Sequence, residues 1–395
     1  MTADRTGDRR RARFLDQLRA DGEPLGGALG DAFARVPREA FLADGFRTAA
    51  GRWVAPRDPD FLTEVYRNDA LVTKVDRDVP VSSSSQPSLM VGMLAALDLR
   101  PGVRVLEIGA GTGYNAALMA ALGAEVTSLD VQPDVVDRAR AALARAGATG
   151  VRVVLGDGYP GHPADAPYDR VIVTVGVTGL SPAWLAQLAP DGYVLAPVAH
   201  VGMHPVLRVA RAEPGTGYGV CGAGFMAARG PLGAAHPWLH PAPPPGRTLP
   251  APTVHRPARW ARPLGPRGYL DLAVAAGAWH PRVTPAGMAG VPDADWSVLD
   301  ATGLGGAALR PDGAVAATGP EAAACADVAG ALVDRWERAG CPGVPAWRVA
   351  LASAGMAGQP ILVPRRWRLF DEPTELPDEP TELPDEPTEL PDEPD

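Results

Sequence analysis

The sequence predicts an α/β protein built around a doubly wound parallel sheet. Between about residues 97 and 198, short apolar segments of strand length alternate with segments of helical periodicity, which is typical of βαβ units. A glycine-rich turn, GAGTG at 109–113, joins the first of these strands to the first helix. The chain has 395 residues, 46% of them hydrophobic, and is long enough for two domains.

The segment before this sheet is predicted to be largely helical. Residues 9–50 read as helices because Phe14, Leu15 and Leu18 recur at helical spacing. Residues 51–80 are mixed and contain turn signals. The run VSSSSQPSLMVGMLAAL, which starts at Val81, predicts a polar loop that leads into an apolar helix.

The sheet itself follows from regular alternation. Gly123 is placed to end the first helix, and Pro133 stands in the first turn of the second. The predicted strands are VRVLEIG (103–109), AEVTSLDV (124–131), VRVVLGD (151–157), YDRVIVTVG (168–176) and GYVLAPVA (192–199), and the helices are YNAALMAALG (114–123), 133–147 and PAWLAQLA (182–189).

A second module is predicted after a proline-rich stretch. Residues 231–266 are too rich in proline for a regular element and are interpreted as a linker or a lid. Beyond them we expect a small α+β module, with a hairpin over 309–318 around Pro-Asp-Gly and a helix over 321–339. The segments WRVALASA (347–354) and ILVPRRWRL (361–369) predict further strands.

The chain ends in three copies of DEPTELP followed by DEPD. Its charge and its prolines predict disorder or polyproline II over 371–395. The tail holds twelve acidic residues, so the net charge of −9 becomes 37 basic against 34 acidic residues without it. The chain without its tail is therefore nearly neutral, which argues against nucleic-acid binding. The predicted parts are 1–80 (helical, substrate-facing), 81–230 (cofactor domain), 231–266 (linker or lid), 267–370 (α+β module) and 371–395 (tail).

Several site classes are not expected. The three cysteines form no CxxC pair, and the histidine pairs with four-residue spacing do not lie on predicted helices, so we expect no disulfide framework and no metal site. The N-terminus has no apolar signal segment, and no uncharged apolar run is long enough to span a membrane. A cytoplasmic protein is the expectation.

Three strand ends carry the signals of a nucleoside cofactor. The glycines after Glu107 let backbone N–H groups approach a ligand. Asp130 follows Gly109 by 21 positions, the spacing at which a carboxylate meets ribose hydroxyls. The carboxylate of Glu107 suits a cationic ligand better than a pyrophosphate, and Asp157 ends the third strand, where it can reach an adenine. The pattern predicts S-adenosylmethionine as the cofactor.

Several segments together resemble the protein-L-isoaspartate O-methyltransferase family over residues 10–210. They are VPREAFL (36–42), YRNDALV (66–72), SSSSQPSLMV (82–91), LEIGAGTGYNAALMA (106–120), GDGYPG (156–161), APYDRVIVT (166–174) and QLAPDGYVLAPV (187–198). The resemblance implies a Rossmann-like class I methyltransferase that methylates a carboxylate and releases S-adenosylhomocysteine.

The resemblance also implies roles for single residues. Ser85, in Ser-Gln-Pro, takes the place of the family's active-site serine, and Ser84 is a second catalytic candidate. Asp130 would hold the ribose, and Asp157 with Gly158 would flank the adenine. The expected cofactor-binding residues are Ser82, Ser83, Glu107, Gly109, Gly111, Gly113, Asp130, Val131, Asp157, Gly158 and Thr174.

The chain departs from plain repair enzymes of the family in two ways. Its serine loop is enlarged, and it continues for more than a hundred residues after the sheet. It therefore looks like homologues encoded beside ribosomal peptide pathways of the graspetide and lanthipeptide kinds. That interpretation implies methylation of one aspartate in a linear or already cyclised precursor peptide, followed by closure to an aspartimide that can open to isoaspartate. The alternatives are repair of isoaspartyl residues in damaged proteins, or a non-catalytic peptide-binding adaptor.

Overall fold

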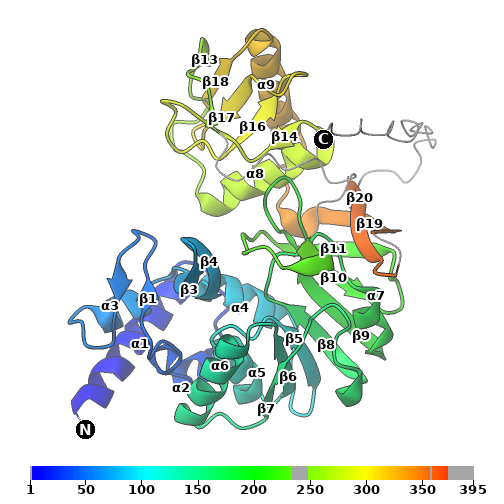
Figure 1. Cartoon of the computed structure of the whole chain (residues 1–395). Coiled ribbons are helices and arrows are strands. Elements are labelled where there is room, and N and C mark those ends of the chain that lie inside the picture. The colour runs from blue at the N-terminus through cyan, green and yellow to red at the C-terminus, as the bar shows by residue number, and fades with distance from the viewer. Residues whose placement is uncertain (1, 234–247, 356–357, 372–395) are drawn as a thin grey trace, which may run out of the picture.

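The computed structural model describes residues 2–233, 248–355 and 358–371 (Figure 1). Its centre is a nine-stranded sheet in the order β20-β19-β11-β10-β9-β8-β5-β6-β7. The five strands from β9 to β7 are parallel, which confirms the predicted α/β sheet, and the other four pair antiparallel. The strands are β5 (Arg104–Ile108), β6 (Glu125–Asp130), β7 (Val151–Leu155), β8 (Tyr168–Val173), β9 (Leu188–Pro197), β10 (Val206–Ala210), β11 (Thr216–Cys221), β19 (Trp347–Ala354) and β20 (Ile361–Leu369).

Alternating side chains along these strands enter two different cores. Val105 and Leu195 pack with the N-terminal helices, whereas Leu106 and Ala196 pack on the opposite face with residues from the C-terminal third. The C-terminal third therefore shares a hydrophobic core with the sheet. The helices of the central region are α4 (Pro87–Ala96), α5 (Tyr114–Ala121), α6 (Pro133–Arg145) and α7 (Pro182–Ala186), with a 3-10 turn η2 (Pro163–Asp165).

The N-terminal region combines helices with a small sheet, in the order β2-β1-β3-β4. The serine run belongs to this sheet: Ser82 pairs with Lys74, and Ser84 with Leu71. The prediction of a polar loop was therefore wrong for Ser82–Ser84, because a neighbouring strand supplies their backbone partners. The elements are α1 (Thr2–Ala20), α2 (Gly27–Arg35), η1 (Arg38–Phe41), β1 (Phe46–Arg47), β2 (Trp53–Val54), α3 (Phe61–Val65), β3 (Leu71–Asp76) and β4 (Val79–Ser84).

The C-terminal third contains a five-stranded sheet in the order β13-β18-β17-β16-β14, packed against two helices (Figure 1). The predicted hairpin over 309–318 and the helix over 321–339 are present as β17–β18 and α9. The elements are η3 (Gly230–Gly233), β12 (Thr248–Leu249), β13 (Val254–Arg256), α8 (Pro266–Trp279), β14 (Val283–Thr284), β15 (Gly287–Met288), β16 (Trp296–Leu299), β17 (Gly306–Leu309), β18 (Val315–Thr318), α9 (Ala322–Arg338) and η4 (Val344–Ala346).

Two expectations about this third need correction. The strands 347–354 and 361–369 exist, but they extend the large sheet beside β11 instead of completing a separate module over 267–370. Pairing satisfies the backbone of β11, which would otherwise form an open sheet edge. The stretch 231–266 also contains β12 and β13, whose partners are distant strands. Residues 234–247 and the repeats from 372 onward lie outside the described residues.

No helix in the described ranges has the length and apolar character needed to cross a bilayer.

Candidate functional site

One large cavity, of about 1050 Å³, opens at the carboxyl ends of β5 and β6. This is the edge at which ligands bind in doubly wound sheets. Its wall includes eleven of the thirteen predicted site residues: Ser82, Ser83, Ser84, Ser85, Gly109, Gly111, Asp130, Val131, Asp157, Gly158 and Thr174. The fold thus brings together residues that are spread over more than ninety positions of the sequence.

The glycine turn lies directly on the cavity wall. Gly109 has a φ of 102°, and a Cβ there would lie 2.7 Å from Oγ1 of Thr174. Gly111 also has a positive φ, and its N–H donates to the Asp130 carboxylate over 3.1 Å. A side chain at either glycine would strain the turn, and its Cβ would crowd Thr174 or the Ser83 carbonyl oxygen. The backbone therefore forms a cradle that fits a nucleoside cofactor.

Gly113 differs from the prediction. It precedes α5 with a φ of 83°, but it is not part of the cavity wall. A Cβ at Gly113 would lie 3.4 Å from the carbonyl oxygen of Ala139 and from Cγ of Leu143. These are ordinary contact distances, so the positive φ is what favours glycine here, and the structure places Gly113 at the start of α5 and not on the cavity wall.

Asp130 is held so that part of its carboxylate faces the cavity. Oδ2 accepts from the Gly111 N–H, and Oδ1 accepts from the Gln132 N–H over 3.0 Å. Burial raises the pKa of Asp130 above its usual range, while these backbone bonds and Lys74 act to lower it. A carboxylate has about four lone-pair positions, so two remain for ligand hydroxyls. Val131, 55% exposed, follows it on the cavity wall.

Asp157 and Gly158 form another part of the cavity wall. Asp157 accepts from the Tyr159 N–H over 2.9 Å, which fixes the turn after β7. A Cβ at Gly158 would lie 2.5 Å from Cγ2 of Ile108, so this backbone must pass close to β5. The carbonyl of Gly158 accepts from the indole of Trp184 over 2.8 Å. A flat ring can lie against this rigid, side-chain-free segment.

The structure does not bring Glu107 to the cavity. Its side chain is fully buried behind the glycine turn and is absent from the wall. Asn115 donates to Oε1 over 2.7 Å, and Ser128 donates to Oε2 over 2.5 Å. Burial raises the pKa of Glu107 to about 7, against these two hydrogen bonds. The prediction of direct cofactor contact is therefore corrected: Glu107 supports Asn115, which does line the cavity.

The raised pKa makes Glu107 a source of pH-dependent stability. Because the folded state holds this proton more tightly than the unfolded state, the free energy of unfolding falls as pH rises from 4.5 to about 7. Glu107→Gln removes the charge, and its amide oxygen can accept from Asn115 while its NH2 group donates to the Ser128 oxygen, which reverses the second hydrogen bond. We expect it to exceed the wild type by roughly 2 kcal/mol at about pH 8 and to match it at about pH 4 in urea unfolding.

Glu125→Gln is the matched control, because Glu125 is exposed on β6. It should leave the pH profile of stability unchanged. A Glu107→Gln protein that is less stable than the wild type at both pH values would contradict the assignment.

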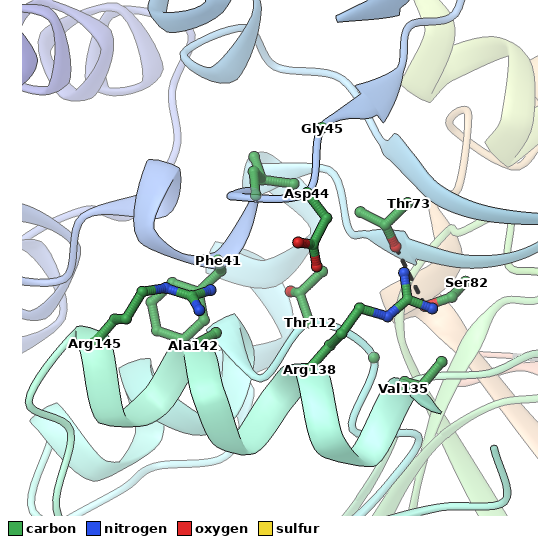
Figure 2. Close-up of a pocket in the computed structure, with 12 residues that line it drawn as sticks. Phe41, Asp44, Gly45, Thr73, Ser82, Thr112, Val135, Arg138, Ala142 and Arg145 are labelled. Carbon is green, nitrogen blue, oxygen red and sulfur yellow. Dashed lines mark hydrogen bonds between the residues drawn. The ribbon is translucent and has the colours of Figure 1, made fainter. Parts of the chain in front are cut away.

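All four serines of the run line the cavity. Ser82 accepts from Oγ1 of Thr73 over 3.4 Å, and it also borders a smaller pocket beside α6 that contains Asp44 and Arg138 (Figure 2). Ser84 is 2% exposed and belongs to the end of β4. Ser85 follows the strand and begins the turn into α4.

Arg38 is a buried residue beside the serines that the sequence patterns did not indicate. It is 1% exposed, and its Nε donates to Oγ of Ser84 over 3.3 Å. The guanidinium also donates to five carbonyl oxygens, those of Val65 (2.8 Å), Arg67 (3.1 Å), Asp69 (3.0 Å), Ser84 (3.3 Å) and Ser85 (3.0 Å). Burial lowers the pKa of Arg38 to about 10, so it stays charged at neutral pH. The signal was available in VPREAFL, but nothing local shows that the arginine turns inward.

Asn68 ties the same loop to α4. Its Oδ1 accepts from the Ser88 N–H over 3.0 Å, and its carbonyl accepts from Nε2 of Gln86, also over 3.0 Å. These bonds satisfy a free N–H in the first turn of α4. The segment YRNDALV therefore fixes the direction in which the chain leaves Ser85.

The cavity reaches well beyond the predicted site. Residues 221–230 form one wall, and Pro266, Arg267 and Leu270 of α8 form another. Arg267 forms an ion pair with the buried carboxylate of Glu23, which joins the C-terminal third to the turn between α1 and α2. No signal in the sequence pointed to either group.

Comparisons with known proteins agree with this geometry. The profile of the family "Protein-L-isoaspartate(D-aspartate) O-methyltransferase (PCMT)" matches residues 9–217. A protein-L-isoaspartate O-methyltransferase of Methylorubrum populi is 36% identical over 208 residues, which cover 52% of this chain and 88% of the relative. One from Pyrococcus horikoshii is 32% identical over 209 residues, covering 52% and 84%.

A solved structure named protein-L-isoaspartate O-methyltransferase resembles nearly the whole chain. It aligns with a TM-score of 0.50 and 25% identity, covering 89% of this chain and 98% of its own. The matches confirm the expected Rossmann-like fold, the expected carboxyl methyltransferase class and S-adenosylmethionine as its cofactor. Because the profile spans more than half of the sequence and the relatives align over most of their lengths, the chain belongs to the protein-L-isoaspartate(D-aspartate) O-methyltransferase family.

Proposed function

We propose that the protein methylates the α-carboxylate of L-isoaspartyl residues in peptides and proteins. The observation that carries the proposal is one cavity that unites the glycine turn and Asp130 with the serines at the end of β4. Relatives that bear this activity in their names align over the same residues. The site residues assigned from the resemblance remain part of this proposal.

The reaction requires the protein mainly to position the carboxylate and the methyl group. A carboxylate with a pKa of about 3–4 is ionised at neutral pH and needs no general base. S-adenosylmethionine supplies an electrophilic methyl group. The chain must hold the carboxylate oxygen about 3–3.5 Å from that carbon and in line with its leaving group. Ser84 and Ser85 are the candidates for this work, as hydroxyl donors to the carboxylate.

Arg38 favours a donor role for Ser84. Since the Ser84 oxygen accepts from the Arg38 guanidinium, its own O–H is directed elsewhere and can donate to an acceptor in the cavity. The Ser85 backbone is held by the same guanidinium through its carbonyl. The end of β4 and the turn at Ser85 are thus held in place before substrate arrives, which reduces the entropy lost on binding.

Maturation of a ribosomal precursor peptide is a narrower version of this chemistry. It was suggested by the length of the chain beyond the sheet. The solved structure that covers 89% of this chain carries the plain isoaspartyl methyltransferase name, so length does not separate the two activities. Among the described residues, none favours a precursor peptide over a damaged protein as the substrate. Maturation of a precursor is therefore one of the outcomes that the following experiment distinguishes.

The test is mass spectrometry of three matched peptides incubated with the protein and S-adenosylmethionine. One contains L-isoaspartate, one L-aspartate at the same position, and one is the aspartyl peptide closed into a ring. We expect the isoaspartyl peptide to gain one methyl group and then to lose methanol as the succinimide closes. Methylation of the aspartyl or cyclic peptide alone would support maturation. Tight peptide binding without any methylation would support the hypothesis of a non-catalytic peptide-binding adaptor.

Ser85→Ala is expected to reduce kcat/KM for the isoaspartyl peptide by about 10-fold or more, the value of one hydrogen bond to a charged group. Most of the loss should appear in kcat if the bond strengthens in the transition state. Ser353→Ala serves as the control, because Ser353 is exposed on β19. Unchanged kinetics in Ser85→Ala would show that Ser85 is not the hydroxyl donor to the carboxylate and would leave Ser84 as the candidate.

A further inference from the structure

The cavity extends past the reacting groups to a cationic side chain from the C-terminal third. The described residues of its wall include two arginines, Arg229 and Arg267. Arg229 lies 3.8 Å from Asp76, which is 59% exposed. Arg267 instead pairs with Glu23, whose side chain is only 5% exposed, while 68% of the Arg267 side chain remains accessible. Arg267 is therefore anchored at the wall and still open to a ligand.

The position of Arg267 is structurally fixed. It stands in the first turn of α8, whose following residues are packed in the large core. Leu270, one turn later, touches the backbone of Gly222 so closely that a Cβ there would lie 1.9 Å from it. A cation in the first turn of a helix opposes the helix dipole, so helix stability does not explain this arginine.

Residues of α4 and the end of β11 line the cavity between Arg267 and the serines at the end of β4. Ser88, Leu89 and Gly92 of α4 line the cavity directly after the Ser-Gln-Pro turn. α4 packs on β11, and β11 ends at Cys221 beside the α8 contact. From Pro87 to Gly92 a helix rises about 8 Å, which an extended peptide covers in about two to three residues.

We propose that Arg267 binds an acidic side chain that flanks the methylated position in the peptide substrate. The inference rests on the proposed function. Arginine has five N–H donors in a planar fork that matches a carboxylate, and the ion pair with Glu23 occupies only some of them. Glu23 acts as a positioning residue, since it holds the guanidinium at the wall without closing the cavity. Acidic peptides are therefore the preferred substrates.

The experiment compares two isoaspartyl peptides that differ only in the flanking positions, which carry glutamate in one and glutamine in the other. For the wild type we expect kcat/KM to favour the glutamate peptide by about 5–10-fold, mainly through KM, and the preference to shrink with added salt. In Arg267→Gln the ratio should fall to about 1. Because this ratio compares two peptides on the same protein sample, any loss of folded enzyme affects both values equally and cancels.

Arg262→Gln is the matched control, an exposed arginine shortly before α8 that is not on the cavity wall, and it should retain the ratio. Equal kcat/KM for both peptides in the wild type, or an unchanged ratio in Arg267→Gln, would overturn the inference while leaving the proposed function intact. If neither peptide is methylated, the proposed function fails. Calorimetric affinities of the same peptides, with S-adenosylhomocysteine present, then decide the inference, and equal affinities refute it.

Discussion

Arg38→Met is expected to lower the free energy of unfolding by about 3–5 kcal/mol, the largest stability effect of any single side chain discussed for this protein. Five carbonyl oxygens from two chain segments converge on this guanidinium. Methionine fills similar space but donates nothing, so these carbonyls lose their donor. Each buried acceptor left unpaired costs about 1–3 kcal/mol, and entering water recovers part of that.

Urea unfolding, followed by tryptophan fluorescence, measures this loss. Arg38→Lys should recover part of the stability, because an ammonium has three donors and cannot span all the carbonyls. Arg13→Met is the control, since Arg13 is exposed on α1, and it should change stability by less than about 0.5 kcal/mol. A loss below about 1 kcal/mol in Arg38→Met would show that the network is not a stabilising element.

The same substitutions separate stability from positioning. At temperatures where Arg38→Lys is folded, its kcat should still be reduced, because the carbonyls of Ser84 and Ser85 lose part of their support. A lysine variant that is less stable but has wild-type kcat would restrict Arg38 to a structural role.

Asp130→Ala is expected to weaken the binding of S-adenosylhomocysteine by about 100-fold. Two losses combine. The ribose hydroxyls lose a charged acceptor, worth about 1.5–3 kcal/mol per hydrogen bond. The N–H of Gly111 also loses its partner, so the glycine turn is no longer held in the conformation that forms the cradle. Titration calorimetry measures the dissociation constant without requiring catalysis.

Asp137→Asn is the control for this variant. Its side chain is 77% exposed on α6, and it pairs only at the surface with Arg140. It should bind the product cofactor as the wild type does. An affinity of Asp130→Ala within about threefold of the wild type would remove Asp130 from the cofactor site.

The sequence alone determined the local architecture of the sheet and most of the residues that line the large cavity. Strand and helix periodicities repeat within about ten residues, so α9, the hairpin around Pro311 and the strands 347–354 and 361–369 could be placed without tertiary information. Asp130 and Asp157 could be assigned to one pocket because parallel strands bring their carboxyl ends to the same edge.

The tertiary structure alone decided which way side chains face and which distant segments meet. Glu107 and Arg38 are both ionisable and lie in or beside motifs, yet Glu107 is turned away from the cavity and Arg38 contacts the serines at the end of β4. Local pattern cannot distinguish these outcomes, because burial of a charge depends on partners supplied from elsewhere in the chain. For a related reason, the sequence could not predict the pairing of β19 with β11 or the contact of Arg267 with Glu23. Both join residues more than a hundred positions apart, where no periodicity carries information.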